Sequence, residues 1–320
     1  MLDNTKELKE LAEATSLKLN LNQGAIEKDF YITKAIQLLT REKDKYFSLL
    51  FQGGTSLSKG YQLIQRLSED IDFRVILKPK ALALGKEARR KKLRDFRYAL
   101  VNVLRDANFI IPDDAINVLY EGRFMSIQAE FTNSEKISYL KPHIAIECFV
   151  GAPVLPPQST SITTLIKQTI GENCNHPHFS VDCVSLDETA AEKWVALTRR
   201  IAGTQIKTRQ SDKHLVRHLY DLYHLKRSDL LTGEYCNIVG EIVEKDRRQF
   251  KKHNITYTKD PLGTSELALD SLFKDNQWRA HWDSFLEQMV YDEHKPSFDD
   301  AYSSLEKLSI DIFGAIKQKA

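Results

Sequence analysis

Two aspartates one residue apart are the strongest chemical signal in the 320-residue sequence. Asp70 and Asp72 lie at the start of an apolar stretch, residues 71–77, whose composition predicts a β-strand. Because residues i and i+2 of a strand point to the same side, the two carboxylates converge on one place. Such like charges are costly unless a cation lies between them, and oxygen ligands suit Mg²⁺ or Mn²⁺. The alternative is a solvated strand edge, which the flanking apolar residues disfavour, so we predict a metal site at this pair.

A glycine pair precedes the aspartates and ends the apolar stretch 47–52, which predicts a buried strand. Gly53 and Gly54 allow the backbone to approach a ligand closely, since no Cβ intervenes. A helix predicted from Thr55 onward would present free N–H groups and its positive dipole end to a phosphate. The hydroxyls of Thr55 and Ser56 could add donors. We therefore predict that this bend binds the phosphates of a nucleotide.

The remaining periodicities predict an α+β protein with a small mixed sheet flanked by helices, followed by a mainly helical C-terminal domain. Further helices are predicted over 23–39 and 86–105, and further strands over 125–131 and 143–150. Beyond a proline-marked loop at 153–157 the chain looks mainly helical, with helices over 188–201, 214–227 and 243–252 and two near the end. The boundary is placed softly near residue 182, giving an α/β domain over 1–182 and a helical domain over 183–320.

Composition restricts the class of protein. No apolar run approaches the roughly 20 residues that a membrane-spanning helix requires. The first twenty residues mix acids with lysines and do not resemble a signal peptide, so a cytoplasmic location without membrane contact is expected. The net charge is only +2, but basic residues dominate the predicted helix 86–105. That helix either binds a nucleic-acid backbone or is an ordinary solvated face.

The sequence also resembles a known family. Residues 53–73 read GGTSLSKGYQLIQRLSEDIDF, preceded by Glu27-Lys28-Asp29-Phe30 and followed by AEKWVAL and RHLYDLYHL. Together these segments, spread over residues 25 to 227, resemble the AbiEii-type nucleotidyltransferase toxins of the DNA polymerase β-like nucleotidyltransferase superfamily. The resemblance implies a polymerase β-like nucleotidyltransferase core whose active site the helical domain completes. It gives no derivable role to Glu27, Lys28 or Asp29, for which a salt-linked helix face is the simpler reading.

The resemblance implies that Lys193 and Asp221 belong to the active site and that Arg200, or its neighbour Arg199, matches a family arginine. His218 stands where the family usually has an aspartate, which leaves the role of that acid in doubt. Spacing adds that Lys193 and Arg200, seven residues apart on one helix, share a face suited to one polyanion.

Three further residues complete the predicted site. Arg66 and Ser68 are candidates to position Asp70 and the phosphates, although Arg66 could instead only support the turn. Glu147, on the polar face of the strand 143–150, is the candidate third carboxylate, as metal ligand or as proton acceptor. An exposed strand residue is the alternative for Glu147.

The resemblance implies a toxin that transfers NMP from a nucleoside triphosphate to an acceptor hydroxyl, releasing pyrophosphate. The implied acceptor is RNA, at the acceptor end of tRNA, and the implied partner is a cognate antitoxin encoded nearby. Two alternatives stay open from the sequence: a nucleotidyltransferase for small, antibiotic-like acceptors, and a non-catalytic module that binds nucleotide or RNA.

Overall fold

The computed structural model describes residues 5–132, 139–171, 176–205, 212–250 and 255–319. The chain divides into two compact units. The first contains residues 1–62 and 67–184, and the second contains residues 63–66 and 185–320. The second unit therefore begins two residues beyond the boundary predicted from sequence. A four-residue segment of the first half, which includes Arg66, also belongs to the second unit, and the sequence did not suggest this.

A seven-stranded sheet organises the first unit. Its strands are β1 (Phe47–Gln52), β2 (Asp70–Leu77), β3 (Ile116–Leu119), β4 (Phe124–Glu130), β5 (His143–Val150), β6 (Gln158–Thr163) and β7 (His178–Cys183). Their order across the sheet is β3-β4-β5-β2-β1-β7-β6. The pairs β2–β5 and β1–β7 are parallel and the other neighbours are antiparallel, so the sheet is mixed.

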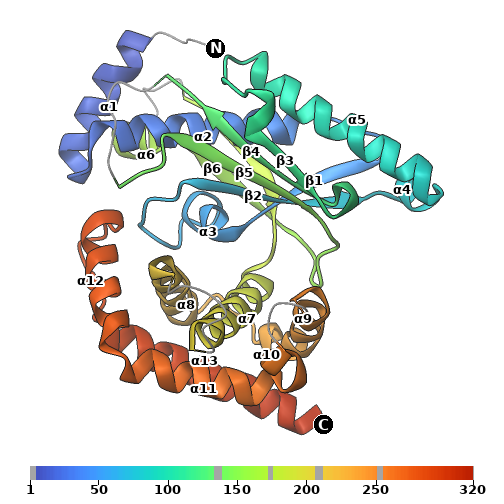
Figure 1. Ribbon diagram of the computed structural model, residues 1–320. Helices are drawn as coiled ribbons and strands as arrows, with labels where there is room; N and C mark the ends of the chain where they lie inside the picture. Colours follow the sequence, from blue (N-terminus) through green and yellow to red (C-terminus); the bar gives the residue numbers. More distant parts are fainter. Residues whose placement is uncertain (1–4, 133–138, 172–175, 206–211, 251–254, 320) are drawn as a thin grey trace. The chain divides into compact units, whose positions relative to one another are not determined.

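The central strand β2 separates an apolar face from a polar one. Ile71 and Phe73 are fully buried and belong to the hydrophobic core of this unit, whereas Asp70 and Asp72 point to the other side. Helices α2 (Gln23–Arg41) and α5 (Lys86–Arg105) cover the apolar face, where ring centroids of Phe47 and Phe96 lie 5.3 Å apart. Figure 1 shows these two helices on one side of the sheet and α3 (Gly53–Thr55) on the other.

Three shorter helices complete the first unit: α1 (Thr5–Leu19), α4 (Pro79–Leu82) and α6 (Leu165–Ile170). Asn22 begins α2, because its side chain accepts a 2.8 Å hydrogen bond from the backbone N–H of Gly24.

Helices are the main elements of the second unit in the part that the structure describes. Its helices are α7 (Leu186–Gln205), α8 (Val216–Arg227), α9 (Glu234–Phe250), α10 (Ile255–Lys259), α11 (Pro261–Lys274), α12 (Asn276–Met289) and α13 (Phe298–Lys319). α7 packs against α8, α9 and α11, and buried aromatic rings on three helices, Trp194, Tyr220 and Trp282, fill the interior. Within the described residues, no helix is both long and apolar enough to cross a bilayer.

The α+β class predicted from the sequence is confirmed, but several elements differ. The helix expected from Thr55 is only one short turn, α3, followed by a π-helical turn, Ser56–Gly60. Gly60 ends this turn and packs closely on β6, where an added Cβ would lie 2.8 Å from Oγ1 of Thr160. The segment after Pro157 also contains two strands, β6 and β7, that the sequence analysis read as mainly helical. Their serines, threonines and histidine weaken the apolar alternation by which strands are recognised.

Candidate active site

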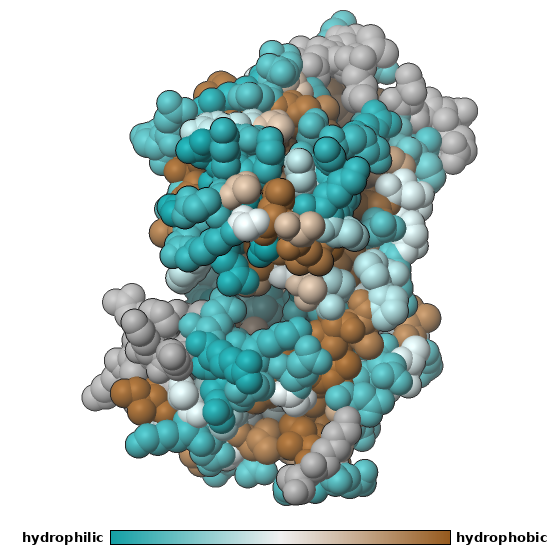
Figure 2. Space-filling view, turned by 90° about the vertical axis from the view of Figure 1, so that its right-hand side faces the viewer, coloured by the Kyte–Doolittle hydropathy of each residue, from teal (hydrophilic) through white to brown (hydrophobic). Residues whose placement is uncertain are grey.

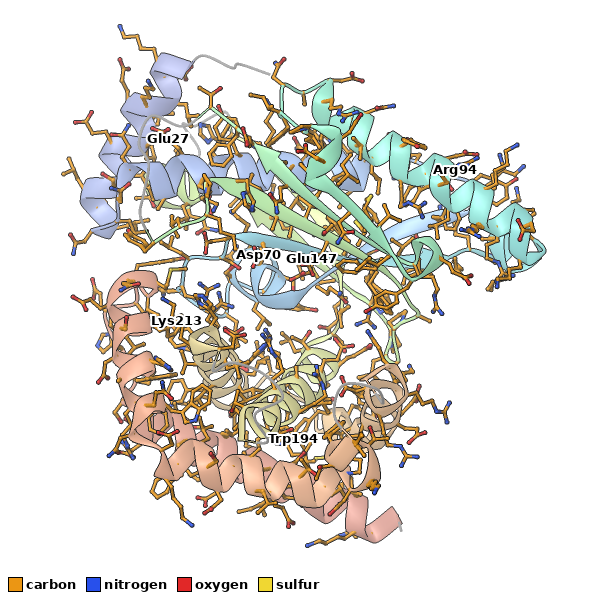
Figure 3. All side chains as sticks on the ribbon, viewed as in Figure 1. Glu27, Asp70, Arg94, Glu147, Trp194 and Lys213 are labelled. Atoms are coloured by element: carbon orange, nitrogen blue, oxygen red, sulfur yellow. The ribbon has the colours of Figure 1, made fainter. Side chains whose placement is uncertain are left out.

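Three carboxylates share the polar face of the sheet. Asp70 and Asp72 lie on β2, and the parallel register places Asp72 directly beside Glu147 of β5. Paired residues of neighbouring strands point to the same face, so Glu147 joins the two aspartates, as Figure 3 shows for Asp70 and Glu147. The third carboxylate proposed from sequence therefore lies in the row of the first two.

The glycine bend packs directly against one of these carboxylates. Gly53 has φ +82°, a conformation that disfavours any residue with a side chain, and a Cβ built on it would lie 2.2 Å from Oδ2 of Asp72. Two constraints thus require glycine at this position. The close approach that the sequence predicted toward a ligand is made here toward the carboxylate itself.

The hydroxyls that follow the bend donate hydrogen bonds to backbone carbonyls. Thr55 Oγ1 donates to the carbonyl of Asp70 and lies 2.6 Å from Oγ of Ser68. Ser56 is fully buried, and its Oγ donates to the carbonyl of Gly53 at 2.9 Å. A hydroxyl has one proton to donate, and both hydroxyls donate it within the protein here. These residues fix the bend and the start of β2.

A lysine that the sequence analysis missed contacts the carboxylate row. Lys141 Nζ lies 2.8 Å from Oδ1 of Asp70, and both side chains are accessible to solvent. Lys141 precedes β5 and stands in no recognisable motif, so only the β2–β5 pairing reveals it.

The residue before Asp70 belongs to a buried ion pair. Lys28 of α2 donates to Oε1 of Glu69 at 2.9 Å, and both side chains are only 4% exposed. Burial lowers the pKa of Lys28, and Glu69 opposes that shift. The pair ties α2 to the residue that immediately precedes Asp70.

Asp29, the next residue of α2, binds the π-helical turn that follows the glycine bend. Asp29 accepts from Lys59 Nζ at 2.6 Å and from the backbone N–H of Leu165 at 2.8 Å. Lys59 lies in the π-helical turn and also donates to Thr33 Oγ1 at 2.7 Å. The Glu27-Lys28-Asp29 segment, for which sequence gave no role beyond a salt-linked face, thus supplies two of the contacts that hold the candidate site.

The pKa of the Glu147 carboxyl is shifted from its ordinary value. Burial raises its pKa, the negative charge of Asp70 raises it further, and Lys141 opposes both. A carboxylate with a raised pKa accepts a proton more readily near neutral pH.

The donor chemistry of this face fits a hard divalent cation. Three carboxylates face the same side, and a cation between them would relieve their repulsion. In the described part of the chain, however, no three acidic, histidine or cysteine groups already gather closely enough to enclose a metal ion. Asp70 and Asp72 therefore fit as two ligands of an open site, with further oxygens supplied by other groups.

The second unit holds a separate charged cluster. Asp221 of α8 accepts from Arg66 through both oxygens, at 2.8 and 2.9 Å, and from Lys193 of α7 at 2.8 Å. Asp221 is fully buried; burial alone would raise its pKa, but the two cations outweigh burial and hold that pKa below its usual range. With both oxygens engaged, Asp221 holds Arg66 and Lys193 in place.

Arg200, expected to share one polyanion with Lys193, has its own partners. It forms an ion pair with Asp212, and its Nη1 atom lies 3.4 Å from Nε2 of His218. Burial, followed by Lys193 and Arg200, lowers the pKa of His218 well below its usual range, so the ring is neutral. This chain therefore places a neutral ring beside its cations where the family usually has an acid.

The structure thus distributes the predicted residues over two groups, each within one unit. The first unit brings together Gly53, Gly54, Thr55, Ser56, Ser68, Asp70, Asp72 and Glu147. The second unit contains Arg66, Lys193, Arg200 and Asp221.

We predict that Gly53→Ala lowers the free energy of unfolding by about 1–3 kcal/mol, the usual cost of a strained backbone conformation. It should also reduce activity further than this destabilisation explains, because the new methyl group displaces the Asp72 carboxylate. Urea unfolding and a transfer assay measure the two effects. Gly85→Ala is the matched control, since no atom lies within 4 Å of its added Cβ and its φ is −62°. Equal behaviour of the two variants would contradict the assignment.

We predict that Lys28→Met destabilises the protein by about 3–5 kcal/mol, because it removes the buried ammonium that offsets the buried charge of Glu69. Adding Glu69→Gln should restore part of that stability, since the amide oxygen still accepts hydrogen bonds without a buried charge. Urea unfolding of the two variants tests this. Lys6→Met removes an ion pair whose side chains are 85% and 67% exposed, and it should change stability little. A Lys28→Met variant no less stable than Lys6→Met would refute the role of the pair.

Comparison with known proteins identifies the family. Residues 37–304 match the profile of the family described as "Nucleotidyl transferase AbiEii toxin, Type IV TA system". No individually curated protein matches the sequence. The match spans β1, the glycine bend, the carboxylate row and most of the helical unit, and it confirms the resemblance seen in the sequence. It begins after Glu27-Lys28-Asp29, whose likeness to the family rests on the sequence alone. The chain belongs to the AbiEii nucleotidyl transferase toxin family of type IV toxin–antitoxin systems.

Proposed function

We propose that this protein transfers the NMP group of a nucleoside triphosphate to a hydroxyl of RNA, at the acceptor end of tRNA, with Mg²⁺ or Mn²⁺ bound by Asp70 and Asp72. Enzymes of this family are nucleotidyltransferases that generally use a divalent metal ion. One observation carries the proposal for this chain: Asp72 lies in register with Glu147, beside Asp70 and against Gly53.

In the proposed reaction the acceptor hydroxyl oxygen forms a bond to the α-phosphorus while the bond from that phosphorus to the bridging oxygen breaks. Pyrophosphate leaves with the electrons of that bond. Glu147 accepts the hydroxyl proton, a role that its raised pKa supports. The cation, when bound, neutralises negative charge that develops on the phosphate oxygens. Asp70 and Asp72 hold it, and the Gly53 bend keeps Asp72 in place.

For the second unit we propose an anion-binding role. Arg66 and Lys193 both bind the carboxylate of Asp221, which brings two cations to one place. Its buried position strengthens the attraction for an oxyanion such as a triphosphate or a pyrophosphate. Arg200, which pairs with Asp212, adds a further cation on the same helix as Lys193.

A basic groove favours RNA over a small acceptor. A hollow of about 860 Å³ lies along α5 and the β3–β4 turn, lined by Glu87, Ala88, Arg90, Lys91, Arg94, Arg97, Val118, Glu121 and Gly122. Within the part of the chain that the structure describes, Arg90, Lys91 and Arg94 make no ion pair or hydrogen bond. Burial and the neighbouring Arg94 and Arg90 lower the pKa of Arg97, which indicates crowded positive charge.

The surroundings of the groove also suit nucleic acid. Tyr98 and Tyr120 are 63% and 62% exposed, and flat rings of this kind can stack on bases. Hydrophilic residues cover most of the first unit on the side of the molecule drawn in Figure 2, with apolar residues exposed among them. Figure 3 places Arg94 on α5, apart from Asp70 and Glu147. A small acceptor would need only the carboxylate row, whereas a polymer can contact both places.

Membership of the family supports two further proposals for this chain. We propose that transfer of NMP to RNA makes the protein toxic to its cell, and that an antitoxin encoded nearby opposes that effect.

We predict that Asp72→Asn lowers the rate of NMP transfer at least about a hundredfold, because loss of a metal-binding charge removes several kcal/mol of transition-state stabilisation. Chelation of divalent ions by EDTA should stop transfer by the unchanged protein, and growth inhibition should disappear with the substitution. Asp182→Asn changes an exposed aspartate of β7 in the same sheet and serves as the control. A fully active Asp72→Asn protein would remove the carboxylate row from the mechanism.

We predict that replacing Arg90 and Arg94 with alanine weakens RNA binding and lowers the slope of log affinity against log salt by about 0.7–0.9 for each phosphate that the variant no longer neutralises. The matched control replaces Arg247 and Arg248, which lie on α9 and pair with Glu244. Binding titrations at several salt concentrations measure the effect, and an unchanged slope would show that the groove does not bind RNA.

Incubating the protein with each α-labelled triphosphate, magnesium and total RNA tests the proposed acceptor. Label on RNA supports the proposal. Label only on small acceptors identifies the alternative enzyme class, and no label on any acceptor indicates a binding module.

A further inference from the structure

The contact between Lys141 and Asp70 brings a partly exposed cation to a carboxylate proposed to bind a metal. Lys141 Nζ lies 2.8 Å from Oδ1 of Asp70, and the two side chains are 46% and 36% exposed. A partly exposed lysine can leave such a partner at low cost, since ion pairs of this kind are weak. The contact therefore does not contribute much to the stability of the fold.

The backbone of Lys141, in contrast, is held firmly. Its N–H donates to Oε1 of Glu69 at 2.6 Å, and its carbonyl accepts from Lys28 Nζ at 2.9 Å. Both groups belong to the buried Lys28–Glu69 ion pair. The pair therefore anchors the backbone at residue 141 while the ammonium at the end of its side chain remains accessible.

We propose that Lys141 binds the triphosphate, and that its ammonium exchanges between Asp70 and a phosphate oxygen as nucleotide and divalent cation bind together. This inference rests on the proposed function, because it requires the metal site at Asp70 and Asp72. It adds a residue to the nucleotide site that neither the resemblance nor the sequence pattern assigns.

Charge balance at Asp70 gives the reason. An ammonium and a divalent cation repel each other, so Lys141 at Asp70 opposes binding of a metal ion alone. A triphosphate supplies other oxygens for the ammonium, and lysine binds phosphate well as a point charge. Transfer of the ammonium to phosphate then leaves Asp70 for the metal. Lys141 thereby makes metal and nucleotide favour each other, and such coupling acts equally in both directions.

A purely structural role for the side chain predicts something different. The hydrogen bonds that hold this segment use the backbone of residue 141, and a substitution of its side chain keeps them. If the ammonium only supported the loop, its removal would change stability and leave the affinities for metal and nucleotide unaltered.

The test measures binding without catalysis. In full-length Lys141→Met protein, Mn²⁺ alone should bind about two- to fivefold more tightly, the range expected when a competing, partly exposed ion pair is removed. Mn²⁺ affinity is read by electron paramagnetic resonance. In the presence of Mn²⁺, the α,β-methylene analogue of the preferred triphosphate should bind about tenfold more weakly, which corresponds to removal of one charge-assisted hydrogen bond to phosphate. Lys141→Arg, which keeps the charge, should recover most of the nucleotide affinity.

Two controls separate the possible failures. Lys274→Met removes an ammonium that pairs with Asp270, an exposed aspartate of α11. This variant should change neither affinity. If Asp72→Asn abolishes Mn²⁺ binding while Lys141→Met leaves both affinities unchanged, the role of Lys141 is overturned and the metal site stands. If Asp72→Asn leaves Mn²⁺ binding intact, the proposed metal site itself is wrong. Weaker binding of Mn²⁺ alone to Lys141→Met would also overturn the inference.

Discussion

The mutual repulsion of Asp70 and Asp72 is the constraint on which the first unit depends. Two carboxylates on one side of a strand, with Glu147 beside them, would move apart without a structure that holds them. The apolar face of β2 supplies most of that restraint, because Ile71 and Phe73 are buried in the core and fix which way the strand faces. The hydrophobic effect thus stabilises an electrostatic arrangement that would not form by itself.

Further contacts then surround two members of the row, Asp70 and Asp72. Gly53 backs Asp72, and Thr55 binds the carbonyl of Asp70. Lys141 contacts the Asp70 side chain. The second unit shows the opposite balance, with two cations, Arg66 and Lys193, around one carboxylate. The first unit thus gathers carboxylates on one face of its sheet, and the second unit gathers two cations around one carboxylate.

The sequence predicted what local spacing can encode. The alternation of a strand was enough to place Asp70 and Asp72 on one side, and the paired glycines marked a close approach. Local spacing cannot predict contacts between distant segments, because these depend on how the elements pack. Examples are the pairing of Asp72 with Glu147, of Lys28 with Glu69 and of Arg66 with Asp221. The hydrogen bond of Ser56 could not be predicted from the sequence either, because the groups around a hydroxyl in the folded chain decide where it donates.

The Lys28–Glu69 pair is hard to explain by stability alone. Burying both charges costs desolvation free energy that their attraction and hydrogen bonds only partly offset, and two apolar side chains would fill the same space without that cost. An apolar pair, however, could not bind the N–H and carbonyl of residue 141. Glu69 and Lys28 satisfy both groups and so fix one backbone position relative to Asp70. The pair is therefore better understood as a device that sets the position of one lysine than as a source of stability.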